Sequence, residues 1–140
     1  MTAKEYLKQY EYATLKILRY QAEYEKEIEL IDNVRSPLGG DGTPHGSGVS
    51  RRTEDQAIKL ASVTRKWEQA MLDAIRIRQE VFDMIRDIDG VEGAILYERY
   101  INLRKWEAVC VMVHLSWYAV HDHHKKALRI VQERLDAKSI

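Results

Sequence analysis

Several residue types are scarce in this sequence, and each scarcity excludes a class of structure. The 140 residues include a single cysteine, Cys110, so no disulfide can form within the chain. Two prolines and one phenylalanine, beside a charged fraction of 31%, favour helices with thin, partly exposed cores over a strand-rich core. No stretch approaches the roughly 18 apolar residues of a membrane span, or the apolar block of a secretory signal. We therefore expect an all-α, cytoplasmic protein with no membrane partner.

The charges balance overall but are unevenly distributed. The chain holds 22 basic and 22 acidic residues, which gives a formal net charge of zero. Met1 to Glu98 holds 14 Lys and Arg against 18 Asp and Glu, whereas Arg99 to Ile140 holds 8 against 4. An acidic body with a basic end is typical of a chain that presents one small surface to an anion. The balanced total argues against a protein that coats nucleic acid indiscriminately.

Two long stretches carry seam residues at alternating steps of three and four, the pattern of paired helices. The first runs from about Ala3 to Asp32, and the second from Thr53, with Gln56 as a capping box, to Asp89. The seam positions are Leu7, Tyr10, Thr14, Ile17, Gln21, Tyr24, Ile28 and Ile31, followed by Ala57, Leu60, Thr64, Trp67, Met71, Ala74, Arg78, Val81, Ile85 and Ile88. We expect residues 1–89 to form a long antiparallel, coiled-coil-like hairpin.

The segment between these stretches, Arg35 to Arg52, holds both prolines and five of the seven glycines. This composition predicts a flexible loop at 35–52. A phosphate-binding loop is not favoured, because no Gly-Lys-Ser/Thr follows the glycines and no apolar strand precedes them.

A third stretch begins at Asp89, again with a capping pattern, and divides into shorter pieces. Helices are predicted over 91–101, 106–113 and about 116–135. Three short helices after two long ones indicate a separate small domain at 90–140.

Three histidines and an aspartate occupy positions 121 to 124. At 100° per residue, His123 points about 160° from His121, so one metal ion cannot bind all three histidines of a regular helix. His124 falls on an apolar stripe, which predicts a buried histidine hydrogen-bonded to a neighbour. The stripe consists of Val120, Ala127, Leu128, Val131 and Leu135.

A site at His121 and His124, with His114 or Cys110 as a third ligand, stays open, although the spacing typical of zinc sites is missing. An HD-type phosphohydrolase would need further ligands on separate helices, and His45 lies in the glycine-rich segment. We expect no metal, no cofactor and no catalytic residue, and hence a protein that is not an enzyme.

The segment 94–135, "AILYERYINLRKWEAVCVMVHLSWYAVHDHHKKALRIVQERL", has the layout of a helix-turn-helix, with a short helix, a tight Val-His-Leu turn and a capped second helix. It resembles region 4 of sigma-70-type factors in its Ile-Leu and Arg-Tyr helix, its Trp-Glu pair, its capping serine and its His-x-x-Ala-Leu. The motif positions are Val109 and Val113 in the first motif helix, Leu115 and Ser116 at the turn, and Val120 in the second. His114 stands where the turn usually has glycine, and Cys110 where the motif prefers alanine.

With the two long stretches and the glycine-rich segment, the whole chain is similar to small phage and prophage regulators of the ArpU/RinA-like type. This resemblance implies a sequence-specific, double-stranded-DNA-binding transcriptional regulator, whose hairpin contacts a second copy in a homodimer or contacts RNA polymerase. Two alternatives stay open: a DNA-packaging protein like a terminase small subunit, and a helical interaction module without DNA binding.

The candidate DNA surface lies on the side of the last helix that faces away from the apolar stripe. A recognition helix normally places its first turns on base edges, which gives the base-reading candidates. These are Tyr118, Ala119, His121 and Asp122, after the cap Ser116. The phosphate-binding candidates are Lys125, Lys126 and Arg129, with Arg104 and Lys105 at the entry to the first motif helix. The alternative is an ordinary solvated face, and Trp106 and Trp117 are expected to pack against the fold.

Overall fold

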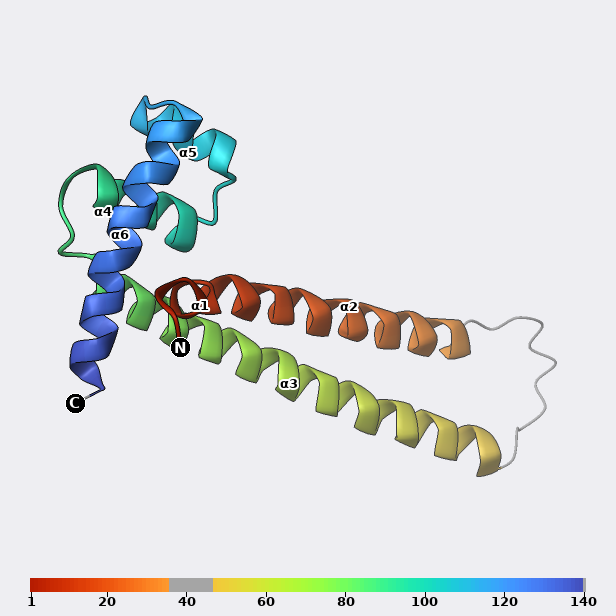
Figure 1. Ribbon diagram of the computed structural model, residues 1–140. Coiled ribbons are helices and arrows are strands. Elements are labelled where there is room, and N and C mark those ends of the chain that lie inside the picture. Colours follow the sequence, from red (N-terminus) through yellow and green to blue (C-terminus); the bar gives the residue numbers. More distant parts are fainter. Residues whose placement is uncertain (36–46, 140) are drawn as a thin grey trace. The chain divides into compact units, whose positions relative to one another are not determined.

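The computed structural model describes residues 1–35 and 47–139, and every regular element in these ranges is helical (Figure 1). The elements are α1 (Ala3–Leu7), α2 (Gln9–Arg35), α3 (Ser47–Ile85), α4 (Gly90–Leu96), the π-helix η1 (Tyr97–Ile101), α5 (Trp106–Val113) and α6 (Trp117–Lys138). The all-α prediction is confirmed.

The two long helices differ in detail from their predicted bounds. The first begins with a capping box, in which the Thr2 hydroxyl accepts from the Glu5 N–H and the Glu5 carboxylate accepts from the Thr2 N–H. Lys8 separates α1 from α2 but keeps helical dihedral angles, so the chain direction is nearly continuous.

The start of the second long helix corrects two predictions. Helix α3 begins at Ser47, so residues 47–52 are helical and Thr53 lies inside the helix instead of capping it. Arg35, the first residue of the predicted loop, is the last residue of α2. No proline follows position 44, so helix formation can extend past Thr53 at the modest cost of one glycine. The remainder of the predicted loop, 36–46, lies outside the described residues. The helix ends at Ile85, before the predicted Asp89.

The helical contacts divide the chain into two compact units. One, here called the compact unit, combines Met1–Thr14 with Asp73–Ile140, and the other, the hairpin unit, is Leu15–Leu72. The predicted boundary at 89/90 differs from this division, because the ends of both long helices are buried with the later helices. Ala3 and Leu7 of α1 and Val81, Met84 and Ile85 of α3 belong to the same buried cluster as residues of α6.

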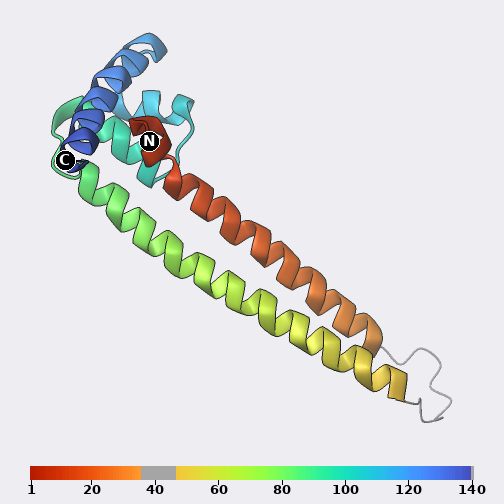
Figure 2. The same cartoon turned by 60° about the horizontal axis from the view of Figure 1, so that its bottom comes forward.

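In the hairpin unit α2 and α3 lie side by side and run antiparallel, as Figures 1 and 2 show and as the heptad pattern predicts. The rings of Tyr24 and Trp67 meet across the seam at 5.2 Å between centroids. The described seam positions of α2 in this unit are all half-buried, as predicted. On α3 the predicted seam residue Met71 is exposed and its neighbour Ala70 is buried. The face of α3 that contacts α2 is therefore shifted by one residue from the predicted seam at this point. Among the described residues of this unit only Ala70 is buried, so the seam is thin.

The compact unit has two buried clusters, and α6 contributes to both. The larger one joins α1, the end of α3, the end of α4, η1 and α6. It contains Leu96, Tyr100, Ile101, Ala127 and Val131 besides the five residues already named. The smaller one joins α4, α5 and α6 through Ile95, Val109 and Val120, with Trp106, Cys110, Val113 and Leu115 packed against it.

The short helices match their predicted positions closely. Helix α5 has the predicted bounds, and α4 with η1 covers the predicted 91–101 helix. His114 ends α5 in the left-handed region, at φ 57° and ψ 41°, where the turn usually has glycine. Ser116 caps α6 as predicted, since its hydroxyl accepts from the Ala119 N–H at 3.2 Å. Asp89 precedes α4 with extended backbone but makes no side-chain capping bond, so that capping prediction is wrong.

Gly93 lets α4 approach the chain that follows α3. A Cβ atom built at this position would lie 1.8 Å from the Ile88 carbonyl oxygen, and backbone cannot yield as a side chain does. We expect Gly93→Ala to lower the free energy of unfolding by about 1–3 kcal/mol, measured by urea denaturation. Ala94→Ser, one position away and exposed, is the control and should have a small effect. A stability loss below that of the control would contradict the close approach.

Candidate nucleic-acid interface

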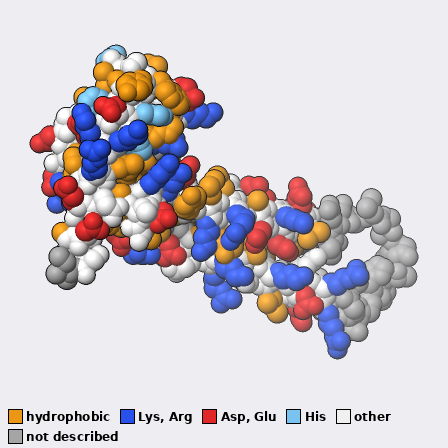
Figure 3. Space-filling view, in the orientation of Figure 1, with side chains coloured by type: hydrophobic (Ala, Val, Ile, Leu, Met, Phe, Trp, Pro, Cys, Tyr) orange, Lys and Arg blue, Asp and Glu red, His pale blue; other side chains and the backbone are white. Residues whose placement is uncertain are grey.

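The exposed side of α6 carries most of the predicted site residues. Figure 3 shows Lys and Arg side chains gathered on the near face of the compact unit, over the middle of α6. Lys125, Lys126 and Arg129 are exposed, and Asp122 lies 4.0 Å from Lys126 one turn away. Tyr118 in the first turn is 83% exposed, which makes it the most accessible large hydrophobic side chain of the compact unit among the described residues.

The first turns of α6 form a small hollow beside these charges. It is lined by Trp117, Tyr118, His121, Asp122 and Lys125. Three of the four base-reading candidates line this hollow; the fourth, Ala119, is half-buried. The arrangement places an aromatic ring, a carboxylate and an ammonium group on one accessible surface.

His121 is held between two indole rings. Its ring centroid lies 4.7 Å from that of Trp106 and 4.4 Å from that of Trp117. The His121 Nδ1 atom is shielded and has no hydrogen-bond partner among the described residues. Trp106 packs into the fold as predicted, while Trp117 remains half-exposed and contacts His121 on one side. His121 is therefore better placed to position Trp117 than to reach a base edge itself.

Arg104 and Lys105 lie just before α5, and their side chains have different surroundings. Arg104 Nε is 2.6 Å from Glu98 Oε2, and its backbone N–H donates to the Glu98 carbonyl. Its carbonyl in turn accepts from Arg99 Nη1 at 2.8 Å. These contacts pair the Arg104 charge within the protein, whereas Lys105, at the cap of α5, is exposed.

One cation of this surface was missed by sequence reasoning. Lys4 of α1 lines a shallow groove with Lys125, Arg129 and neighbouring residues of α6. Helix α1 is fixed there because the Ala3 N–H donates to Gln132 Oε1 at 2.8 Å. The helical pattern groups residues only within one helix, so no local signal relates position 4 to position 125.

The interior side of α6 explains His124. Tyr100 of η1 and His124 share a hydrogen bond of 2.7 Å between the hydroxyl and Nε2, with both side chains buried. Burial, and then the charges of His121, Lys4 and Arg99, lower the pKa of His124 to about 4, while burial raises the pKa of Tyr100 to about 12. Both groups are neutral at pH 7, and the predicted buried, hydrogen-bonded histidine is confirmed.

The three neighbouring histidines thus have three different surroundings. His123 Nδ1 lies 3.0 Å from Glu92 Oε1 of α4, and this hydrogen bond lowers the pKa of Glu92. His121 contacts indoles, and His124 contacts Tyr100. Within the part of the chain that the structure describes, no group of three His, Cys, Asp or Glu residues is arranged to hold a metal ion.

Comparisons of the chain with protein-family models, with curated proteins and with solved structures found no match. In the described ranges no helix combines the length and the apolar character needed to cross a membrane.

We expect the free energy of unfolding to fall as the pH drops from 6.5 towards 4. An unfolded chain protonates histidine near pH 6.5, whereas folded His124 resists protonation to about pH 4, so its contribution is complete above pH 6.5 and is lost below it. Urea unfolding at pH 7.5 and 5.0 measures this loss. His124→Leu should remove about 1–2 kcal/mol of the pH dependence.

Tyr100→Phe is the matched control, because it deletes the hydrogen bond but leaves a buried histidine to titrate. This variant should be less stable at both pH values and should keep the pH dependence. Identical pH dependence in the wild type and His124→Leu would contradict the assignment.

Proposed function

We propose that the protein is a sequence-specific DNA-binding transcriptional regulator in which α5, the turn at His114 and α6 act as a helix-turn-helix. The observation that carries the proposal is the joint geometry of turn and surface. A left-handed residue ends α5, Ser116 caps α6 two residues later, and the exposed side of α6 is lined with cations.

The packing around the turn supports the proposal, because a helix that contacts DNA bases must be held in a fixed orientation. Val109 of α5 and Val120 of α6 are both fully buried in one cluster with Ile95 of α4. The first turns of α6 therefore project from a fixed core, with Tyr118 exposed, as insertion into a major groove requires.

The charges support a division of roles on this surface. Lys4, Lys125 and Arg129 share one groove and would bind phosphates. Lys126 follows Lys125 on α6 and Lys105 caps α5, and both are exposed for the same role. Tyr118 and Asp122 lie towards the start of α6, where base contacts are made, and a carboxylate accepts from the amino group of cytosine.

A second candidate function, a helical interaction module, is favoured by one observation. Val111 and Met112 at the end of α5 and Trp117 at the start of α6 are exposed apolar side chains near the turn. Such residues suit a protein partner better than a phosphate backbone, and RNA polymerase is the partner that a regulator would contact.

We expect the surface residues to fall into two classes in DNA titrations across salt concentrations, with duplexes selected from a random library. Lys4→Ala, Lys125→Ala and Arg129→Ala should weaken binding to all duplexes alike and reduce the salt slope by about one each, because each removes one phosphate neutralisation. Tyr118→Ala and Asp122→Ala should leave the slope nearly unchanged and reduce discrimination between sites by about 1–3 kcal/mol.

Lys16→Ala, an exposed lysine of the hairpin unit, is the control and should change neither quantity. If no duplex is selected, or if all five variants behave alike, α6 does not read DNA. The interaction module would then be the better description.

A further inference from the structure

Trp117 presents an indole ring to solvent at the start of the candidate recognition helix. It is the first residue of α6 and is 51% exposed, whereas Val120, three residues later, is fully buried. Burial of a large aromatic side chain is favourable, so an indole left at the surface is available to a ligand. Neither buried cluster of the compact unit includes Trp117. Packing of the core therefore does not explain a tryptophan at this position.

A stack of rings nevertheless holds this indole in place. The guanidinium carbon of Arg99 lies 5.0 Å from the centroid of the Trp106 ring, and Trp106 packs against the smaller buried cluster. The His121 ring follows, with its centroid 4.7 Å from that of Trp106 and 4.4 Å from that of Trp117. The stack thus connects the exposed indole to the core. A side chain that is fixed before binding loses little conformational entropy when a ligand arrives.

The exposed indole adjoins charged side chains of α6. Trp117 lines the small hollow at the start of this helix together with Tyr118, Asp122 and Lys125. A cation suits a ligand that carries phosphates, and a carboxylate accepts from the amino groups of bases. The exposed apolar side chains of α5 lie outside this hollow. These surroundings favour DNA over an apolar protein surface as the ligand of Trp117.

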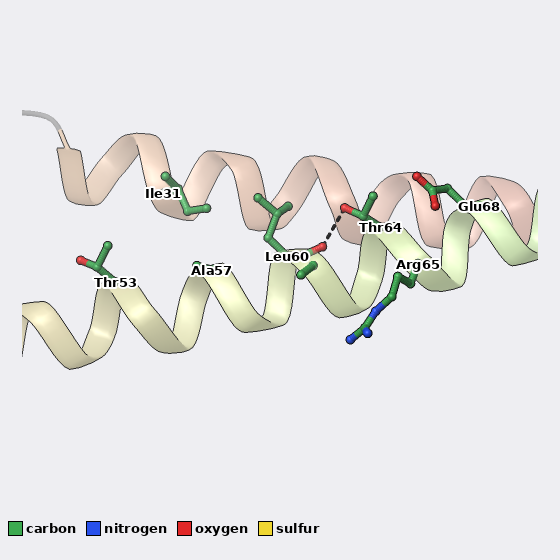
Figure 4. Close-up of a pocket in the computed structure, with 8 residues that line it drawn as sticks. Ile31, Thr53, Ala57, Leu60, Thr64, Arg65 and Glu68 are labelled. Carbon is green, nitrogen blue, oxygen red and sulfur yellow. Dashed lines mark hydrogen bonds between the residues drawn. The ribbon is translucent and has the colours of Figure 1, made fainter.

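The groove of the hairpin unit has a different composition. Its lining includes aliphatic and small side chains, such as Ile31, Leu60 and Ala57, and one charge of each sign, Arg65 and Glu68 (Figure 4). None of the described residues that line this groove is aromatic. An aromatic ring beside a carboxylate and an ammonium group therefore distinguishes the hollow at the start of α6.

The major groove of DNA offers one apolar group to such a ring. The base edges there carry hydrogen-bond donors and acceptors, and the single apolar group among them is the C5-methyl group of thymine. Because the first turns of a recognition helix meet the base edges, an indole at the start of α6 can cover this methyl group. Removal of a methyl group from water raises an affinity about fourfold.

We propose that Trp117 contacts the C5-methyl group of a thymine in duplex DNA, and that His121 positions Trp117 for this contact. The inference rests on the proposed function and adds a specificity-determining residue to it. Trp117 recognises thymine at one base pair, beside the base contacts of Tyr118 and Asp122. His121 acts through Trp117 and does not itself touch the base.

Replacement of thymine by deoxyuridine tests the contact, because it removes only the methyl group. Each thymine of a duplex selected from the random library is replaced in turn, and at one position the dissociation constant of the wild type should rise about fourfold. The Trp117→Ala protein should bind the thymine and deoxyuridine duplexes equally well at that position. Val111→Ala, which changes an exposed apolar residue of α5 outside the hollow, is the control and should keep the fourfold ratio.

The outcomes separate this inference from the proposed function. A selected duplex in which no thymine is sensitive to replacement would overturn the inference and leave the proposed function intact. A ratio that persists in Trp117→Ala, or that Tyr118→Ala abolishes, would do the same. Failure to select any duplex would overturn both.

Two variants of His121 test its positioning role. His121→Ala removes the ring that contacts Trp117, and should reduce the ratio of the two dissociation constants from about fourfold to below about twofold. His121→Phe keeps a ring at this position and should restore the ratio, because His121 Nδ1 has no hydrogen-bond partner among the described residues. A purely structural role would weaken binding to both duplexes alike. An unchanged ratio in His121→Ala would therefore overturn the positioning role.

Photochemical cross-linking tests the contact without any change to the protein. In 5-bromodeoxyuridine a bromine atom replaces the methyl group, and ultraviolet light attaches the base at this position to a residue that contacts it. With this nucleotide at the sensitive position, mass spectrometry of the wild-type complex should identify Trp117 as the attached residue. Attachment to Tyr118, or to a residue of α5, would overturn the assignment.

Discussion

The buried stripe of α6 is the constraint on which the compact unit depends. Val120 belongs to the cluster shared with α4 and α5, Ala127 and Val131 belong to the cluster shared with α1, α3 and η1, and His124 lies between them. Because one helix completes both clusters, its rotation about its own axis is fixed, and its opposite side is necessarily the one presented to solvent. The accessibility of the cations and of Tyr118 follows from this burial.

Periodicity predicted most of the helices because it reports burial within one element. It identified α5 with its bounds, the Ser116 cap and the stripe that contains His124. It could not predict how far α3 extends before Thr53. The first residue of a helix depends on the helix propensities of the residues there, here serine, glycine, valine and arginine, and these differ by small free energies. Nor could periodicity predict the π-helix at 97–101, whose wider turn buries both Tyr100 and Ile101.

The candidate site shows more clearly that periodicity describes one helix at a time. A helical wheel gives the direction of a side chain but not what it meets, so it separated His121, His123 and His124 without identifying Trp106, Glu92 and Tyr100 as their partners. Arg104 forms an ion pair with Glu98 across the turn that follows η1, and no periodic pattern predicts such a contact. Lys4 joins the surface from the other end of the chain.

The two units differ in how much apolar surface each buries. The hairpin unit buries only Ala70 among its described residues, so its thin seam contributes little apolar burial to its own stability. In the compact unit α6 contributes to two buried clusters, although Val111, Met112 and Trp117 stay exposed near the turn. Because both clusters fix α6 from one side, its opposite side keeps one orientation in solvent, which the proposed reading of bases by Tyr118 and Asp122 requires.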